Sequence, residues 1–187
     1  MDYIKTISQK ADRLNHIVQD VFEVSKAATG NISLDLEDLD IGKLLQQTFG
    51  EMEEDLRQST LAWRVEIPDT PMLVHADGQR LYRVFQNLIQ NALKYSLDGS
   101  RVYIALKRED GMLTASVTNT SADELDGSID YTARFTRGDS SRTDGGSGLG
   151  LSIARSFTEA CDGTFRIAII ADLFTAYVTF KAVSPEE

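Results

Sequence analysis

The chain has 187 residues, of which 42% are apolar, so it is long enough to bury one good hydrophobic core as a globular protein. Its formal net charge of −10 argues against a general affinity for nucleic acid or anionic lipid, both of which favour an excess of lysine and arginine. A single cysteine, Cys161, excludes an internal disulfide and a Cys/His metal cluster, and no apolar run approaches the length of a membrane span.

The first thirty residues have the pattern of a long helix. Apolar or small residues recur in alternating steps of three and four from Ile4 to Val21, which is typical of a coiled coil or helical bundle, and Gly30 ends the pattern. We expect a helix over 1–30 that pairs with a second copy or with a partner helix. It begins at Met1 without a preceding cap residue, so we expect the chain to have been cut from a longer protein.

Three further helices are predicted. Asp40 is a suitable N-cap for a helix whose apolar residues extend to Leu56. Asp77 similarly caps a helix over 78–96, in which six apolar residues share one face. A last helix is expected over 148–160, directly after a glycine-rich stretch.

Alternating or extended segments predict the strands, and the pair Asp110-Gly111 predicts a tight hairpin turn between two of them. The polar segment 121–147 is too long for an ordinary loop and is expected to act as a lid. Together these elements predict an α+β fold, a two-layer sandwich in which helices cover one face of a mostly antiparallel sheet. The extended segments are 32–36, 61–67, 72–76, 101–110, 111–120, 164–169 and 173–181.

The glycine-rich stretch GGSGLGLSIARS occupies residues 145–156. A flexible loop before a helix would explain it, but glycines at a helix N-terminus also let backbone N–H groups approach a phosphate. The spacing Gly146, Gly148, Gly150 fits neither the dinucleotide fingerprint, which needs glycine where Leu151 stands, nor the P-loop, which needs a following lysine. By itself the stretch leaves both interpretations open.

A polar stripe runs along the helix over 78–96. Asn87 and Asn91 lie four residues apart on one face, and Lys94 with Tyr95 continue it by one turn. A solvated face would give the same pattern. However, amide oxygens are ligands for hard cations such as Mg²⁺, and a lysine one turn away suits a phosphate chain.

In order and spacing, four motifs over roughly 34–180 resemble the boxes of a sensor histidine kinase ATP-binding domain. They are the asparagine helix, the strand ending at Asn119, the segment ARFTRGDSSR and the glycine-rich stretch. The resemblance implies a Bergerat-type ATP-binding fold over 31–187. It also implies that 1–30 is the second helix of a dimerisation and phosphotransfer hairpin.

The resemblance also implies the site. Asn91 would hold Mg²⁺, and Lys94 would contact the phosphates of ATP. Asn87 stands where related ATPases have a glutamate that activates water, so hydrolysis should be slow. Tyr95 would lie along the ribose or base, and Asn119 would face the adenine amino group. The expected catalytic residues are Asn87, Asn91 and Lys94, and the binding residues also include Tyr95, Asn119, Phe135, Arg137, Arg142, Gly146, Ser147, Gly148, Leu149 and Gly150.

The sequence departs from the family at two places. The usual D-x-G-x-G becomes Asn119-Thr120-Ser121-Ala122-Asp123, which lacks the carboxylate and both glycines. No His-Glu-x-x-Thr-Pro motif is present, because His16 lacks the following acidic residue and proline, and His75 is expected to be structural or exposed. The fragment is therefore not expected to phosphorylate itself.

The leading hypothesis is a catalytic domain that transfers the γ-phosphoryl group of ATP to a histidine on a hairpin missing from this chain, for relay to the receiver domain of a response regulator. The resemblance also implies a homodimer for the full-length protein, which we expect to be membrane-anchored with this soluble part in the cytoplasm. Alternatives are a serine kinase or ATPase of the same fold, or a nucleotide-binding scaffold without transfer activity. Neither nucleic acid nor direct membrane contact is expected for this fragment.

Overall fold

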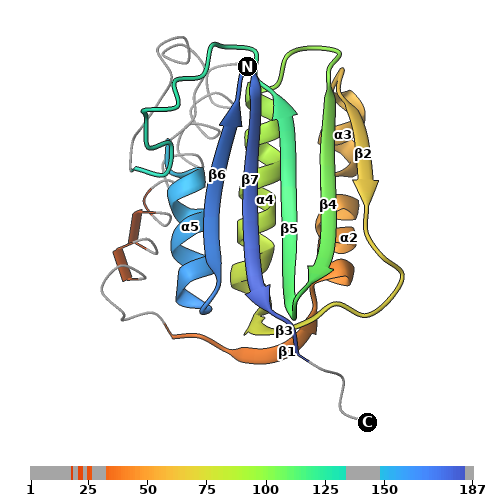
Figure 1. The fold of residues 1–187 in the computed structure, drawn as a ribbon, viewed down its shortest axis with the longest axis vertical. Coiled ribbons are helices and arrows are strands. Elements are labelled where there is room, and N and C mark those ends of the chain that lie inside the picture. Colours follow the sequence, from red (N-terminus) through yellow and green to blue (C-terminus); the bar gives the residue numbers. More distant parts are fainter. Residues whose placement is uncertain (1–17, 19–20, 23–24, 27–32, 134–147, 184–187) are drawn as a thin grey trace, which may run out of the picture.

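The computed structural model describes residues 18, 21–22, 25–26, 33–133 and 148–183. The described part is a two-layer sandwich in which all the labelled helices lie on one face of the main sheet (Figure 1), so the predicted fold class is confirmed. The elements are β1 (Leu36–Asp40), α2 (Ile41–Glu51), α3 (Glu53–Gln58), β2 (Ala62–Glu66), β3 (Leu73–Asp77), α4 (Gly78–Tyr95), β4 (Arg101–Glu109), β5 (Met112–Thr120), α5 (Gly150–Ala160), β6 (Thr164–Ile170) and β7 (Leu173–Lys181).

The main sheet has the strand order β2-β4-β5-β7-β6. Only β2 and β4 pair in parallel; the other neighbours are antiparallel. A second, two-stranded sheet of β1 and β3 lies at one end of the main sheet (Figure 1). A hydrogen bond of 2.8 Å from Val183 N to Leu73 O ties this small sheet to the chain leaving β7.

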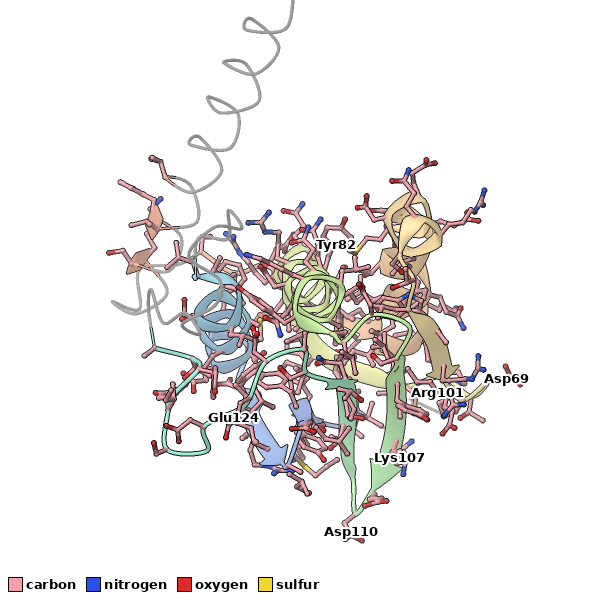
Figure 2. All side chains as sticks on the ribbon, turned by 90° about the horizontal axis from the view of Figure 1, so that it is seen from above. Asp69, Tyr82, Arg101, Lys107, Asp110 and Glu124 are labelled. Atoms are coloured by element: carbon pink, nitrogen blue, oxygen red, sulfur yellow. The ribbon has the colours of Figure 1, made fainter. Side chains whose placement is uncertain are left out.

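The core lies between α4, α5 and the sheet, and Figure 2 shows the helices on one side of the strands. On α4, every residue of the predicted apolar face is at most 3% exposed, namely Leu81, Val84, Phe85, Leu88, Ile89 and Ala92. On the sheet, alternate residues of β5 point into the same core, beginning at Leu113 and ending at Asn119. The apolar face of α4 and the inward-pointing residues of β5 therefore pack against the same core.

The predicted caps and turn are confirmed. The Asp40 carboxylate accepts hydrogen bonds from Gly42 N at 2.9 Å and Lys43 N at 3.3 Å, so α2 begins where expected. In the β4–β5 hairpin, Asp110 and Gly111 have φ angles of 50° and 75°, which a two-residue turn of this hand requires. Asp110 lies at the tip of the hairpin in Figure 2.

Three predicted boundaries differ from the structure. The helix expected to continue to Leu56 is two helices, because Met52 leaves the helical conformation just after Gly50, a weak helix former. The extended piece lies at 36–40 as β1, which pairs with β3, whereas it was expected at 32–36. Finally, α5 begins at Gly150, since Gly148 has a φ of 69° and cannot belong to a right-handed helix.

Two predicted segments are described only in part. Of the leading helix, residues 18, 21–22 and 25–26 are helical, and the remainder lies outside the described residues, as does His16. The coiled-coil interpretation therefore stays a prediction. Of the segment 121–147, residues 121–133 form turns and bends, and 134–147 lie outside the described part.

The carboxylate of Asp77, at the end of β3, bonds both the start of α4 and the residue before β1, and it gives a test of the fold. It accepts a hydrogen bond from Arg80 N at 3.0 Å, which caps α4, and one from Asp35 N at 3.0 Å, while the residue is 6% exposed. We predict that Asp77→Ala lowers the free energy of unfolding by about 2 kcal/mol, because the helix cap and the part-buried bond from Asp35 N are both lost. Urea unfolding followed by circular dichroism measures this change.

Asp38→Ala is the matched control. Its carboxylate lies 2.7 Å from His75 Nδ1 on the β1–β3 sheet, but both side chains are more than half exposed. Such an exposed pair contributes less than about 1 kcal/mol. Equal losses of stability in the two variants would contradict the role assigned to Asp77.

Candidate functional site

Helix α4 presents its predicted polar residues beside the buried apolar face. Asn87 and Asn91 are half-buried, four residues apart, whereas Lys94 is exposed. The Lys94 Nζ lies 5.0 Å from the centre of the Tyr95 ring. The Asn91 carboxamide forms no hydrogen bond with the described part of the chain, so its oxygen is available to a ligand.

Asn87 lies directly against the start of α5. Its Nδ2 donates a hydrogen bond of 2.7 Å to Arg83 O one turn back on α4. A methyl group added at Gly150 would lie 3.1 Å from Asn87 Oδ1. Glycine at position 150 therefore allows the first turn of α5 to approach the Asn87 carboxamide.

The N-terminus of α5 has no side-chain cap. Its N-cap residue is Leu149, whose side chain has no oxygen to satisfy the first N–H groups of the helix, and Gly148 precedes it with a φ of 69°. Such N–H groups together with the helix dipole favour negative charge. Of the predicted residues, Gly150 lies beside Asn87, and Gly148 and Leu149 directly precede it.

Asn119 lies at the end of β5, on the face that the helices cover. It is 2% exposed and stands in register between Val102 of β4 and Phe174 of β7. Its carboxamide forms no hydrogen bond within the described part of the chain. Its donors and acceptor are therefore not used by the described part of the chain. The side chain therefore fits direct contact with a polar ligand.

The segment after Asn119 is tied to the end of α4. Leu97 N donates to Thr120 O, and Ala122 N donates to Tyr95 O, both at 2.9 Å. These bonds bring the Asn119 end of β5 next to Tyr95. None of residues 119–123 has a positive φ, so this backbone path does not need the glycines that the family motif has at these positions.

The described start of the predicted lid packs near Asn119. The Tyr131 ring contacts Phe174 edge to face, with ring centres 6.1 Å apart. Arg155 of α5 donates a hydrogen bond of 2.9 Å to Thr132 Oγ1, and the Thr132 hydroxyl lowers the pKa of the neighbouring Asp130. Tyr131 and Phe174 were not among the predicted site residues. The alternation in β7 could have indicated the inward direction of Phe174, but only strand pairing places it beside Asn119.

Five of the predicted site residues lie outside the described residues. They are Phe135, Arg137, Arg142, Gly146 and Ser147. Within the described part, no group of three or more His, Cys, Asp or Glu side chains could hold a metal ion. A cation here would depend on amide oxygens and on the ligand's own phosphates, and the unpaired Asn91 carboxamide fits that role.

A hollow of about 1070 Å³ lies between α2 and the first half of α4. None of the predicted site residues lines it. Gln47 donates a hydrogen bond to Glu51 that lowers the pKa of this carboxyl, and the Glu51 carboxylate raises the pKa of Tyr82. Tyr82 lies on the side of α4 away from the sheet (Figure 2).

In the described part of the chain, no helix has the length and apolar character needed to cross a membrane.

Comparison with known proteins identifies the family. Residues 76–184 match the family described as histidine kinase-, DNA gyrase B-, and HSP90-like ATPase. The chain is 31% identical to Sensor protein SphS of Synechococcus elongatus over 171 residues, which cover 86% of this chain and 41% of SphS. It spans less than half the length of the curated relatives it matches.

Two solved structures share the fold. ShkA, solved as the full-length protein in complex with AMPPNP, gives a TM-score of 0.78 at 24% identity, covering 98% of this chain and 39% of that one. The histidine kinase ThkA in complex with the response regulator protein TrrA gives a TM-score of 0.73 at 19% identity, covering 98% of this chain and 51% of that one. Neither the serine kinase nor the scaffold alternative gains support from these relatives. The chain belongs to the histidine kinase-, DNA gyrase B- and HSP90-like ATPase family.

Proposed function

We propose that this domain binds ATP with Mg²⁺ and transfers the γ-phosphoryl group to a histidine on a helical hairpin, for relay to a response regulator. The observation that supports this best is the arrangement along α4. Asn87 lies beside the start of α5, Asn91 follows it by one turn of α4, and Tyr95, at the end of the same helix, lies next to the Asn119 end of β5. One extended nucleotide would fit this arrangement, with its triphosphate near Asn87 and the start of α5 and its base near Tyr95 and Asn119.

Each predicted site residue then has a proposed role in binding the nucleotide. Asn91 would hold Mg²⁺, which neutralises phosphate charge, and Lys94 would contact the phosphates, as would the N–H groups at 148–150. Tyr95 and Asn119 would contact the ribose and base. Phe135 would pack beneath the lid, and the set Arg137, Arg142, Gly146 and Ser147 would complete the triphosphate site.

Asn87 favours transfer over hydrolysis. Its carboxamide cannot accept a proton at neutral pH, and its Nδ2 is already bonded to Arg83 O. Water at the γ-phosphorus would therefore lack a base. A histidine imidazole is itself a nucleophile: its nitrogen forms the bond to phosphorus while the bond to the bridging oxygen breaks, and ADP leaves. Positioning and charge neutralisation supply most of the catalysis in such a reaction.

The partners belong to the same proposal. Residues 31–187 would form the catalytic domain, and 1–30 the second helix of the hairpin, through which the full-length protein would dimerise. The ThkA structure contains a response regulator, and the catalytic domain of our chain shares its fold, which supports a receiver domain as the final acceptor. An anchored protein with this domain on the cytoplasmic side fits the same scheme.

Calorimetric titration with a non-hydrolysable ATP analogue and Mg²⁺ tests the proposal first. We expect saturable binding, followed by transfer of label from ATP to a purified histidine-bearing hairpin. Absence of binding at millimolar analogue would reject the proposal, whereas binding without transfer would favour the scaffold alternative.

Asn91→Ala should weaken analogue binding at least tenfold in the presence of Mg²⁺ and change it little in EDTA, since about 1.4 kcal/mol for one lost ligand gives a factor of ten. Gln90→Ala is the matched control, because Gln90 is the adjacent, exposed residue of α4. Equal affinities for Asn91→Ala and Gln90→Ala in Mg²⁺ would contradict the role of Asn91.

Gly150→Ala should also weaken binding of the analogue. Its new Cβ would lie 3.1 Å from Asn87 Oδ1, so the carboxamide or the start of α5 must move by a few tenths of an ångström. Gly50→Ala is the control, since a Cβ there meets nothing within 4 Å and should stabilise α2. The same titration gives both affinities; an unchanged affinity in Gly150→Ala would refute the close approach of Asn87 as a requirement.

A further inference from the structure

The backbone of Asn119 is fixed, but no hydrogen bond in the described part of the chain fixes the orientation of its carboxamide. Strand pairing with β4 and β7 fixes the backbone, and the residue is 2% exposed. Yet its carboxamide forms no hydrogen bond within the described part of the chain. Nothing described in the protein therefore selects which of its two ends, the oxygen or the NH₂, faces a ligand.

We propose that Asn119 makes the base site tolerant at position 6 of the purine, so that the domain binds 6-oxopurine triphosphates as well as ATP. This inference rests on the proposed function, because it assumes that the base lies at Asn119. It concerns the substrate class of that site, which neither the fold nor the family match determines.

The chemistry follows from the donors and acceptors. An ionised carboxylate only accepts hydrogen bonds, so it pairs with the 6-amino group of adenine and repels the 6-oxo group of hypoxanthine or guanine. A carboxamide accepts through its oxygen and donates through its NH₂ group. Rotation by about 180° around the last side-chain torsion exchanges these two ends at nearly equal shape. Asn119 can thus satisfy either substituent without rebuilding the pocket.

The absence of a partner among the described residues is what makes this exchange possible. If a neighbouring group bonded the Nδ2 atom, the oxygen would always face the ligand and the site would prefer adenine. The residues in register with Asn119 are Val102 and Phe174, whose side chains are apolar and cannot bond either end. The hydrogen bonds of the adjacent segment join backbone atoms of Thr120 and Ala122 to α4 and do not involve the carboxamide.

Inosine triphosphate is the most informative probe. It differs from ATP at the 6-position, where an oxo group replaces the amino group, and it lacks the 2-amino group of GTP. We expect the unaltered chain to bind inosine triphosphate and ATP, each with Mg²⁺, with dissociation constants within about tenfold of each other. Competitive displacement of a fluorescent ATP analogue measures both constants.

Asn119→Asp should restore discrimination. The carboxylate repels the triphosphate of both nucleotides to the same extent, so this effect cancels in the ratio of their dissociation constants. We expect that ratio to shift by at least about tenfold in favour of ATP, because the 6-oxo group would face an acceptor. Asn119→Ala, which removes both ends, should weaken both nucleotides and leave the ratio near that of the unaltered chain.

Failure of this inference can be distinguished from failure of the proposed function. If the unaltered chain binds ATP but binds inosine triphosphate more than about a hundredfold more weakly, the tolerance is refuted while the proposed function stands. If neither nucleotide binds, both fail. Strong binding of inosine triphosphate with weak binding of GTP supports the inference and shows that the 2-amino group is excluded separately. The first comparison needs no substitution, so a variant that does not fold cannot decide the test.

Discussion

The packing of α4 across the sheet is the constraint on which the site depends. Six apolar residues of this helix are buried, and the helix can rotate very little without exposing one of them. This fixes the direction of the flanking residues Asn87 and Asn91. The second helix of the layer, α5, can approach α4 at Asn87 because position 150 has no side chain. Hydrophobic packing thus places the neutral amide of Asn87 beside a helix N-terminus, with the amide of Asn91 one turn further along α4.

The other end of the site depends on strand pairing. Asn119 is the last inward residue of β5, and its neighbours on β4 and β7 are distant in sequence. Backbone bonds from Leu97 and Ala122 then join the loop after β5 to the last turn of α4. One helix therefore touches both ends of the site, which makes the distance between them a property of α4 itself. Loss of the motif glycines does not disturb this link, since the backbone of 119–123 stays in regions open to any residue.

Local signals in the sequence predicted the elements well. Asp40 and Asp77 mark helix starts because a carboxylate satisfies the first N–H groups, and Asp110-Gly111 marks a hairpin because both residues accept positive φ. Contacts between segments that are distant in the sequence could not be predicted from these local signals. The parallel pairing of β2 with β4, the pairing of β1 with β3 and the contact of Tyr131 with Phe174 depend on which surfaces meet in the core. The break at Met52 was missed because the apolar period continues through it.

Charge gives the last constraint. The chain has a formal net charge of −10, so a triphosphate approaches a molecule that repels it overall. Within the described part, the groups that we propose for the nucleotide are the amides at 87, 91 and 119, the backbone N–H groups at the start of α5, and Lys94. A carboxylate at 119 would add another negative charge at a buried position. The amide avoids this repulsion, and it also gives up the fixed acceptor that would single out adenine. In this domain, reduced repulsion of the triphosphate and reduced discrimination at the base follow from the same residue.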